Sequence, residues 1–190
     1  MNLNHTKSFT VEGGLVVLMM FLFVQMSFTQ VNWLTFEEVE LLQQDEKKKI
    51  FVDVYTDWCG WCKKMDANTF NEEDISKYLN DNFYPIKFDA EQKEDISYNG
   101  KVYKYIKMGR RGYNELALEI LKGKLGYPSI VFIDEDLEVI QPIEGYKGPS
   151  VFKMIMTYFA GDHYKTTPWK SYSKSFDPNT GMDYSKVVKH

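Results

Sequence analysis

Hydrophobic positions along the chain change their spacing several times, and the changes delimit alternating helices and strands. Thr35 and Glu38 have the spacing of a capping box and predict a helix that runs to about residue 46. Short runs of β-branched and aromatic residues predict buried strands at 50–55, 83–88, 129–134 and 137–143. Apolar positions three and four residues apart predict further helices at 72–80, 114–122 and 149–161.

The order of these elements indicates an α/β fold with a mixed sheet. Helices between the first strands favour parallel pairing, whereas the short turn at 134–136 predicts an antiparallel hairpin between the last two strands. Two segments have weaker patterns. Residues 91–112 are polar and ambiguous, with a weak strand-like alternation at 101–106. Residues 162–190 are rich in polar residues, and we expect an irregular tail that packs back through Trp169, Tyr172 and Phe176.

The N-terminal segment has the layout of a secretory signal peptide. An unbroken apolar run of ten residues, 15–24, is followed by Ser27 and Thr29 ahead of a candidate cleavage site before Gln30. The run is too short to span a bilayer as a helix, which needs roughly 20 residues. We therefore expect residues 1–29 to direct export to the periplasm or an equivalent compartment. An uncleaved anchor, holding the protein on the inner membrane and facing the periplasm, is the alternative. We expect the folded domain at 30–161 and a C-terminal extension at 162–190.

The composition excludes several classes of protein. The chain has 190 residues, of which 44% are hydrophobic and 16% aromatic, so a sizeable core can form and a wholly disordered chain is not expected. The formal net charge of −4 argues against non-specific nucleic-acid binding, which needs a basic face. Only two cysteines are present, too few for a disulfide-stapled scaffold or a four-thiolate zinc site.

The two cysteines, Cys59 and Cys62, are three positions apart where a loop is expected to pass into a helix. At a helix start, free backbone N–H groups and the helix dipole favour an anion, so the pKa of the Cys59 thiol is expected to fall. Cys62 would face Cys59 one turn later and can resolve a mixed disulfide formed there. Trp58 and Trp61 frame the pair with apolar surface that a peptide substrate can contact.

Three interpretations other than redox chemistry stay open for this pair. A zinc site needs at least two more ligands, and the histidines that follow residue 29 are His163 and His190. A structural disulfide is permitted in an exported protein, although closing so small a loop adds little stability. The pair can also be a chance occurrence.

The segment 51–63 (FVDVYTDWCGWCK) resembles the active-site segment of thioredoxins. In that family an apolar strand carries a buried aspartate six residues before the first cysteine, and Asp53 holds this position. The resemblance implies that the pKa of Asp53 is raised and that Asp53 exchanges a proton with Cys62. A capping or surface aspartate is the alternative. Gly60 follows the first cysteine as in thioredoxins, whereas Trp61 replaces their proline.

A second segment, 126–134 (GYPSIVFID), resembles the thioredoxin-family stretch in which a cis proline opens the strand beside the cysteines. The resemblance implies that Pro128 is cis and that Tyr127 offers its backbone to the substrate. An ordinary trans proline at a strand start is the alternative. The dipeptide 145–146 (GY) also matches the family. Lys87 lies where thioredoxins often hold a lysine near the buried aspartate, or it is a simple solvated lysine.

The resemblance covers about residues 35–160 and is nearest to secreted bacterial thioredoxin-like proteins and the C-terminal periplasmic domain of the transmembrane reductant DsbD. It implies a thioredoxin-like fold, with a mixed sheet of four to five strands flanked by helices. An insertion precedes the cis-proline strand, and a tail follows the domain. The extra residues within 91–125, which include Arg110, Arg111 and the helix at 115–122, form either a longer crossover over the sheet or a lip on the substrate groove.

The resemblance implies a secreted thiol–disulfide oxidoreductase that acts on protein disulfides and is a reductase rather than an oxidase. Its catalytic residues would be Cys59, Cys62 and Asp53. Its substrate-binding residues would be Trp58, Gly60, Trp61, Tyr127 and Pro128. We expect no cofactor beyond the redox-active Cys59–Cys62 disulfide, and no metal. Expected partners are disulfide-containing proteins and a membrane thiol reductant or other redox partner, with membrane contact only if residues 1–29 are retained. A peptide-binding module with a non-catalytic disulfide is the alternative.

Overall fold

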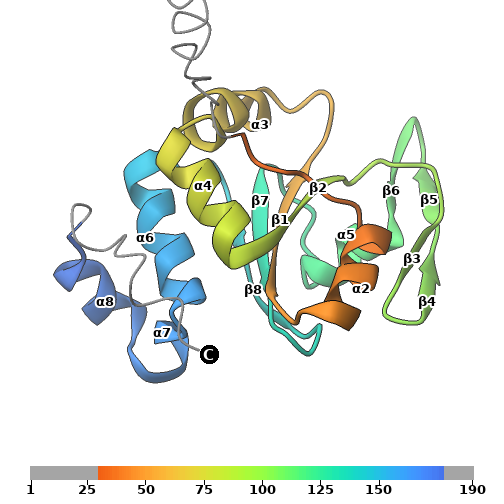
Figure 1. Cartoon of the computed structure of the whole chain (residues 1–190). Coiled ribbons are helices and arrows are strands. Elements are labelled where there is room, and N and C mark those ends of the chain that lie inside the picture. Colours follow the sequence, from red (N-terminus) through yellow and green to blue (C-terminus); the bar gives the residue numbers. More distant parts are fainter. Residues whose placement is uncertain (1–29, 178–190) are drawn as a thin grey trace, which may run out of the picture.

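A four-stranded mixed sheet forms the centre of the computed structural model, which describes residues 30–177 (Figure 1). Its strands lie in the order β2-β1-β7-β8. β1 is parallel to β2, and β7 is antiparallel to both of its neighbours. The predicted α/β fold with a mixed sheet is therefore confirmed. The strand bounds are Lys49–Tyr55 for β1, Phe83–Asp89 for β2, Ser129–Ile133 for β7 and Val139–Glu144 for β8.

Helices cover both faces of this sheet (Figure 1). α2 (Phe36–Asp45) and α5 (Glu115–Ile120) pack against one face. The other face is covered by α3 (Gly60–Met65), the π-helical turn η1 (Asp66–Phe70), α4 (Glu73–Asn82) and α6 (Pro149–Ala160). α2 begins with the predicted capping box, in which Thr35 and Glu38 each accept a hydrogen bond from the other's backbone N–H.

β1 divides the hydrophobic core into two halves, because successive side chains of a strand point to opposite faces of the sheet. Ile50, Val52 and Val54 belong to the half under α2 and α5. Phe51 belongs to the half under α4 and α6. Asp53 follows Phe51 by two positions, so its carboxyl group points toward the helices that follow the cysteines. The alternation of β1 therefore places a single acidic side chain on the face where the predicted site lies.

The polar segment between β2 and α5 forms two β-hairpins (Figure 1). β3 (Ile96–Tyr98) pairs with β4 (Lys101–Tyr103), and β5 (Tyr105–Met108) pairs with β6 (Arg111–Asn114). The strand predicted at 101–106 is thus wrong as one element, because β4 folds back on β3 whereas β5 pairs forward with β6.

The described part of the C-terminal extension is helical, so the expected irregular tail is corrected for residues 162–177. It contains α7 (His163–Thr166) and α8 (Trp169–Ser175). Trp169 and Tyr172 pack on Tyr158 of α6, with ring centroids 5.2 and 4.9 Å away, and Phe176 lies 6.0 Å from Tyr172. The expectation that the tail packs back on the domain is confirmed for Trp169 and Tyr172, whereas Phe176 contacts Tyr172 within the tail. Aromatic contacts with α6 thus hold a polar segment in helical form.

The predicted signal peptide, residues 1–29, lies outside the described residues, so cleavage and anchoring both stay predictions. Within residues 30–177, no helix has the length and apolar character needed to cross a membrane.

We expect Phe51→Ala to lower the free energy of unfolding by about 3–5 kcal/mol, because a buried aromatic ring is lost and a cavity remains. Phe51 is fully buried and its ring contacts those of Phe70, Phe132 and Phe152. Met108→Ala is the matched control, since this side chain is 64% exposed, and should cost less than about 0.5 kcal/mol. Urea denaturation of the oxidised proteins measures both. Equal losses for the two variants would contradict the assignment of the core.

Candidate active site

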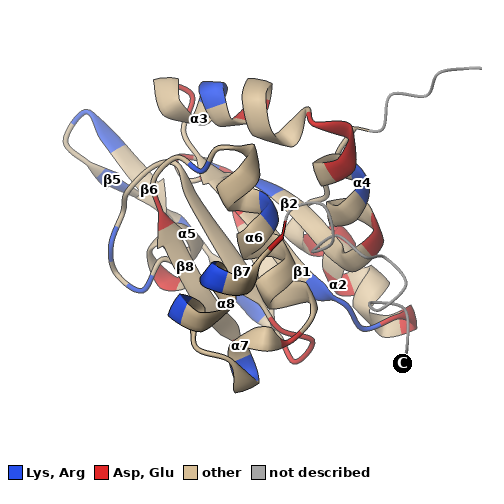
Figure 2. Ribbon diagram, turned by 90° about the vertical axis from the view of Figure 1, so that its left-hand side faces the viewer, with Lys and Arg blue, Asp and Glu red and all other residues tan. Residues whose placement is uncertain are grey.

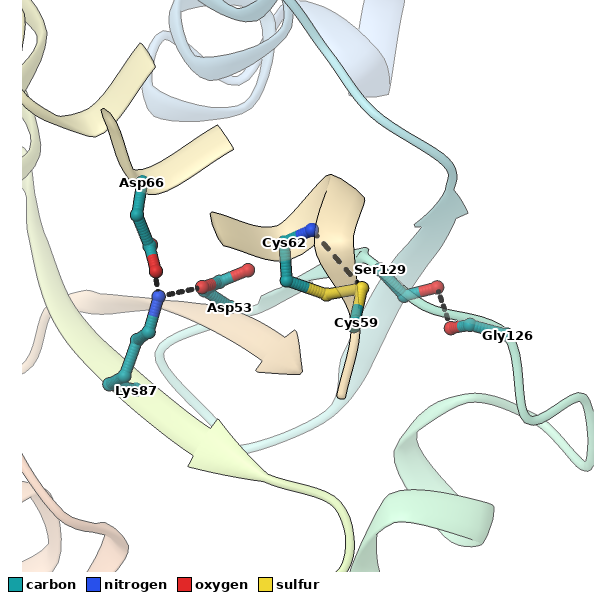
Figure 3. Close-up of a disulfide and its surroundings, with 7 residues drawn as sticks. All are labelled: Asp53, Cys59, Cys62, Asp66, Lys87, Gly126 and Ser129. Carbon is teal, nitrogen blue, oxygen red and sulfur yellow. Dashed lines mark hydrogen bonds and ion pairs between the residues drawn. A yellow bond between two sulfur atoms is a disulfide. The ribbon is translucent and has the colours of Figure 1, made fainter. Parts of the chain in front are cut away.

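A disulfide joins Cys59 and Cys62 at the start of α3, directly after β1 (Figure 3). Cys59 is the N-cap residue, and its Sγ accepts a hydrogen bond from the Cys62 backbone N–H at 3.1 Å. The Cys59 N–H in turn donates to the Thr56 carbonyl oxygen, which closes the turn between strand and helix. Cys59 and Cys62 are only 5% and 2% exposed. The helix start is therefore built around the first sulfur, as the spacing predicts.

Asp53 lies on β1 behind the disulfide and is 1% exposed. Its Oδ2 accepts a hydrogen bond from Lys87 Nζ at 2.5 Å, while its Oδ1 is buried and has no hydrogen-bond partner among the described residues. In Figure 3, Asp53 lies between Lys87 and Cys62. Burial raises the pKa of Asp53 to about 6, because loss of solvent around the carboxylate outweighs the attraction of Lys87. The prediction of a buried aspartate with a raised pKa is confirmed.

Lys87 forms ion pairs with two carboxylates, those of Asp53 and Asp66 (Figure 3). Asp66 opens η1, four residues after Cys62, and its side chain is 43% exposed. Burial alone lowers the pKa of Lys87, but the two carboxylates outweigh this and raise it, so Lys87 stays charged. The ammonium also lies over the rings of Trp33 and Tyr55. Lys87 is thus the lysine beside the buried aspartate. Asp66 was missed, although its spacing from Cys62 on one helix was a usable signal.

The Tyr127–Pro128 peptide bond is cis and immediately precedes β7, which confirms the expectation for Pro128. β7 pairs with β1, and Ser129 lies opposite Val54. Ser129 donates a hydrogen bond to the Gly126 carbonyl oxygen, and the Gly145 N–H donates to the Pro128 carbonyl oxygen. These two hydrogen bonds hold the segment that leads into β7, one on each side of the cis peptide. The register brings the cis peptide to the same end of β1 as the cysteine loop.

Two exposed tryptophans flank the disulfide, and each lies under a cation. Trp58 is 51% exposed, and the Arg111 guanidinium carbon lies 4.3 Å from its ring centroid. Trp61 is 57% exposed, and Lys64 Nζ lies 4.8 Å from its ring centroid. Such contacts are cation–π interactions.

Both tryptophans also contact a tyrosine on the cis-proline side of the site. Trp58 packs edge-on against Tyr127 with ring centroids 6.0 Å apart, and Trp61 lies 5.5 Å from Tyr146. Gly60 is the first residue of α3, and a Cβ there would meet no atom within 4 Å, so the space beside the cysteines is open. All eight residues predicted for the site therefore lie in one region. Arg111 belongs to the insertion for which a lip on the substrate groove was one alternative, but its contact with Trp58 was not predicted because it depends on an unpredicted hairpin.

Within residues 30–177, no group of three or more His, Cys, Asp or Glu side chains is arranged to hold a metal ion, so this part of the chain supplies no ligand set for zinc.

A groove of about 650 Å³ lies elsewhere, between β8, α6 and the C-terminal helices. Its walls include Ile143, Val151 and Trp169, and none of the predicted site residues lines it.

Comparison with known proteins relates parts of the chain to several curated proteins. An uncharacterized protein of Caenorhabditis elegans is 31% identical over 123 residues, which are 60% of this chain and 15% of that protein. The thiol:disulfide interchange protein DsbD of Photorhabdus laumondii is 32% identical over 57 residues, which are 30% of this chain and 10% of that protein. The chain thus spans a small part of the length of these curated relatives.

Comparison with solved structures supports a thioredoxin-like fold. A thioredoxin-fold protein from Helicobacter pylori superposes with a TM-score of 0.52 at 15% identity, covering 75% of this chain and 87% of that one. Residues 20–150 match the model of the Thioredox_DsbH family, described as a protein of unknown function, DUF255. The match includes both cysteines, Asp53 and the cis proline. The chain therefore belongs to the Thioredox_DsbH (DUF255) family of thioredoxin-like proteins.

Proposed function

We propose that this protein is an exported thiol–disulfide oxidoreductase that reduces disulfides in partner proteins. The observation that carries the proposal is the position of the Cys59–Cys62 disulfide between a helix start and a buried carboxylate. The helix start favours a thiolate at Cys59. One oxygen of the Asp53 carboxylate lies on the side of Cys62 and has no hydrogen-bond partner in the described part of the chain (Figure 3).

The reaction takes two exchanges of bonds, starting from the dithiol form. The Cys59 thiolate attacks one sulfur of the partner's disulfide, forms a mixed disulfide and releases the partner's other sulfur as a thiolate. Cys62 then loses its proton and attacks Cys59 Sγ, which releases the partner's second thiolate and forms the Cys59–Cys62 disulfide. Two electrons pass from this chain to the partner. A membrane thiol reductant or another dithiol protein then returns the pair to the dithiol form.

Asp53 is the proton acceptor for Cys62 in this scheme. With a pKa of about 6, its carboxyl group is largely ionised at pH 7 yet binds a proton more readily than an exposed aspartate. Lys87 holds Oδ2, which leaves Oδ1 for Cys62. Lys87 and Asp66 are positioning residues. Within residues 30–177 they pair with carboxylate or ammonium groups, and neither forms a hydrogen bond with Cys59 or Cys62.

Tyr127, Pro128 and the two tryptophans would bind the substrate. Tyr127 has no backbone–backbone hydrogen bond to another described residue, so its polar groups are available to pair with an extended peptide. The exposed faces of Trp58 and Trp61 supply apolar contact on either side of the disulfide. Gly60 leaves room for the peptide to approach Cys59.

The direction of electron flow follows from how strongly the Cys59 thiolate is held. Among the described residues, the Cys62 N–H is the one hydrogen-bond donor to Cys59 Sγ, and no lysine or arginine side chain donates a hydrogen bond to that sulfur. Strong stabilisation of the thiolate makes a dithiol pair oxidising, because it favours the reduced form. The modest stabilisation here supports a reductase.

Reduction of insulin by dithiothreitol tests the proposal. We expect the wild type to accelerate it and Cys59→Ser/Cys62→Ser to be inactive, because both exchanges need a thiolate. Cys62→Ser should accumulate mixed disulfides on Cys59 that are released by excess dithiothreitol. A wild type no faster than the double variant would leave a peptide-binding module with a non-catalytic disulfide.

Export has its own test. Mass spectrometry of the exported protein should find a mature N-terminus at or near Gln30.

Asp53→Asn should slow the resolving step by about 10²-fold at pH 7, because the proton acceptor of Cys62 is lost. Stopped-flow measurement of mixed-disulfide resolution against pH checks this. The slowing should shrink as pH falls below about 6, where wild-type Asp53 becomes protonated. A variant with the wild-type rate throughout would contradict the assigned role.

The same variant should be more stable than the wild type above pH 6. The folded-state pKa of Asp53, about 6, is above the usual value of 3.8, so the wild type loses stability as pH rises from about 4 to 6. Asp53→Asn lacks this loss, and its advantage in unfolding free energy should grow by about 2–3 kcal/mol across that range. Urea denaturation of the oxidised proteins measures it. The exposed control Asp136→Asn should follow the wild type, and a constant difference for Asp53→Asn would count against the buried charge.

A further inference from the structure

The two hairpins inserted before β7 differ in burial. In the first, Ile96, Tyr98 and Tyr103 are buried in the core under α2 and α5. In the second, every side chain from Ile106 to Arg111 is exposed, and Met108 is 64% exposed. The first hairpin therefore belongs to the fold, whereas the second extends from the body of the molecule (Figure 2). We call residues 104–113, which include β5 and β6, the cationic arm.

The arm has a strong positive charge on a chain whose net charge is −4 (Figure 2). It contains four cations and no acidic residue: Lys104, Lys107, Arg110 and Arg111. None of these four forms an ion pair with another residue in the range 30–177. By contrast, Lys101 of the first hairpin pairs with Glu119. The positive charge of the arm is thus available to a ligand outside the chain.

The arm is joined to the site by a row of contacts. β5 pairs with β6 so that Met108 lies opposite Arg111, which places both side chains on one face of the hairpin. Arg111 stacks over Trp58, and Trp58 packs against Tyr127 next to the cis proline. Exposed apolar and cationic groups therefore continue from the arm to the disulfide.

We propose that the cationic arm binds an acidic segment that flanks the target disulfide of the partner protein. This inference rests on the proposed function and names its substrate class. The planar guanidinium of Arg111 can stack on Trp58 and still present N–H donors to a carboxylate. Lys107 and Arg110 add charge around it, and Met108 adds apolar surface. The combination of an exposed aromatic ring, an arginine and a methionine is typical of protein-binding surfaces.

Two carboxylates lie near Tyr127, the residue before the cis proline. Asp89 and Glu91 lie near enough to Tyr127 to contribute to the rise of its pKa, after the larger effect of burial. An acidic segment is repelled by these carboxylates and attracted by the cations of the arm. The acidic residues of the partner should therefore lie against the arm and not against Tyr127.

The test uses two disulfide-bonded peptides that are identical except for the residues flanking one cysteine, which are Asp and Glu in one and Lys in the other. The readout is the ratio of their kcat/KM values for reduction by the full chain, which does not depend on the fraction of active protein. Lys107→Glu/Arg110→Glu leaves two cations and two anions on the arm, so it cancels the net charge of the arm while it retains Arg111 over Trp58. Lys170→Glu/Lys174→Glu is the matched control, because these exposed lysines lie on α8, at the opposite side of the molecule in Figure 1.

We expect the wild type to prefer the acidic peptide by about tenfold at low salt, and this preference should shrink at 0.5 M salt. The arm variant should lose or reverse it, and the α8 variant should keep it. Equal kcat/KM for both peptides, or equal ratios in the two charge-reversal variants, would overturn the proposal.

Binding of the same peptides to Cys59→Ser/Cys62→Ser, followed by fluorescence anisotropy, separates the two proposals. This variant cannot exchange disulfides, so tighter binding of the acidic peptide there would support the arm even if the wild type proved inactive as a reductase. Loss of that preference when Lys107→Glu/Arg110→Glu is added would assign it to the arm. Active reduction without any preference in rate or binding would refute the arm alone.

Discussion

The buried carboxylate of Asp53 is the constraint on which the rest of the site depends. An ionised group without solvent is costly unless a partner lies beside it. The parallel register of β1 and β2 places Lys87 opposite Asp53, and α3 continues into η1 so that Asp66 reaches the same ammonium. Two carboxylates share one cation, and Asp53 keeps an oxygen that has no partner within residues 30–177. The sheet therefore holds a carboxyl group that stays reactive because its charge is incompletely compensated.

Three strands are needed to assemble this site from segments far apart in the sequence. β1 delivers Asp53 at its centre and the cysteine loop at its end, β2 delivers Lys87, and β7 delivers the cis peptide. The strand registers are set by the alternation of buried apolar side chains, since a slip by one residue would move each side chain to the other face. Packing of Phe51 and its neighbours thus fixes the register that brings the reactive groups together.

Much of this arrangement could be predicted from the sequence, because it depends on short-range patterns. The capping box at Thr35, the cysteine spacing and the proline before β7 each have a local signature. The hairpins were missed, although the residues at their turns were usable signals. Asn99 and Gly100 form the turn between β3 and β4, and Gly109 begins the turn between β5 and β6. All three residues have positive φ. Asn-Gly and Gly-x are typical hairpin turns. The contact of Arg111 with Trp58 had no local signature, since 52 intervening residues fold before the two meet.

The buried first hairpin explains how an exposed second hairpin keeps a definite position. Tyr103 ends the first hairpin in the core and hydrogen-bonds Glu119 of α5, while Asn114 ends the second hairpin buried and caps α5. Both ends of the arm are therefore fixed. Within the arm, Tyr105 packs so closely over Gly112 that a Cβ there would lie 2.5 Å from its ring. A surface ordered before binding loses little conformational entropy when a partner arrives. The insertion can thus add a recognition surface to the thioredoxin fold while the residues that hold Asp53 and the cysteines remain unchanged.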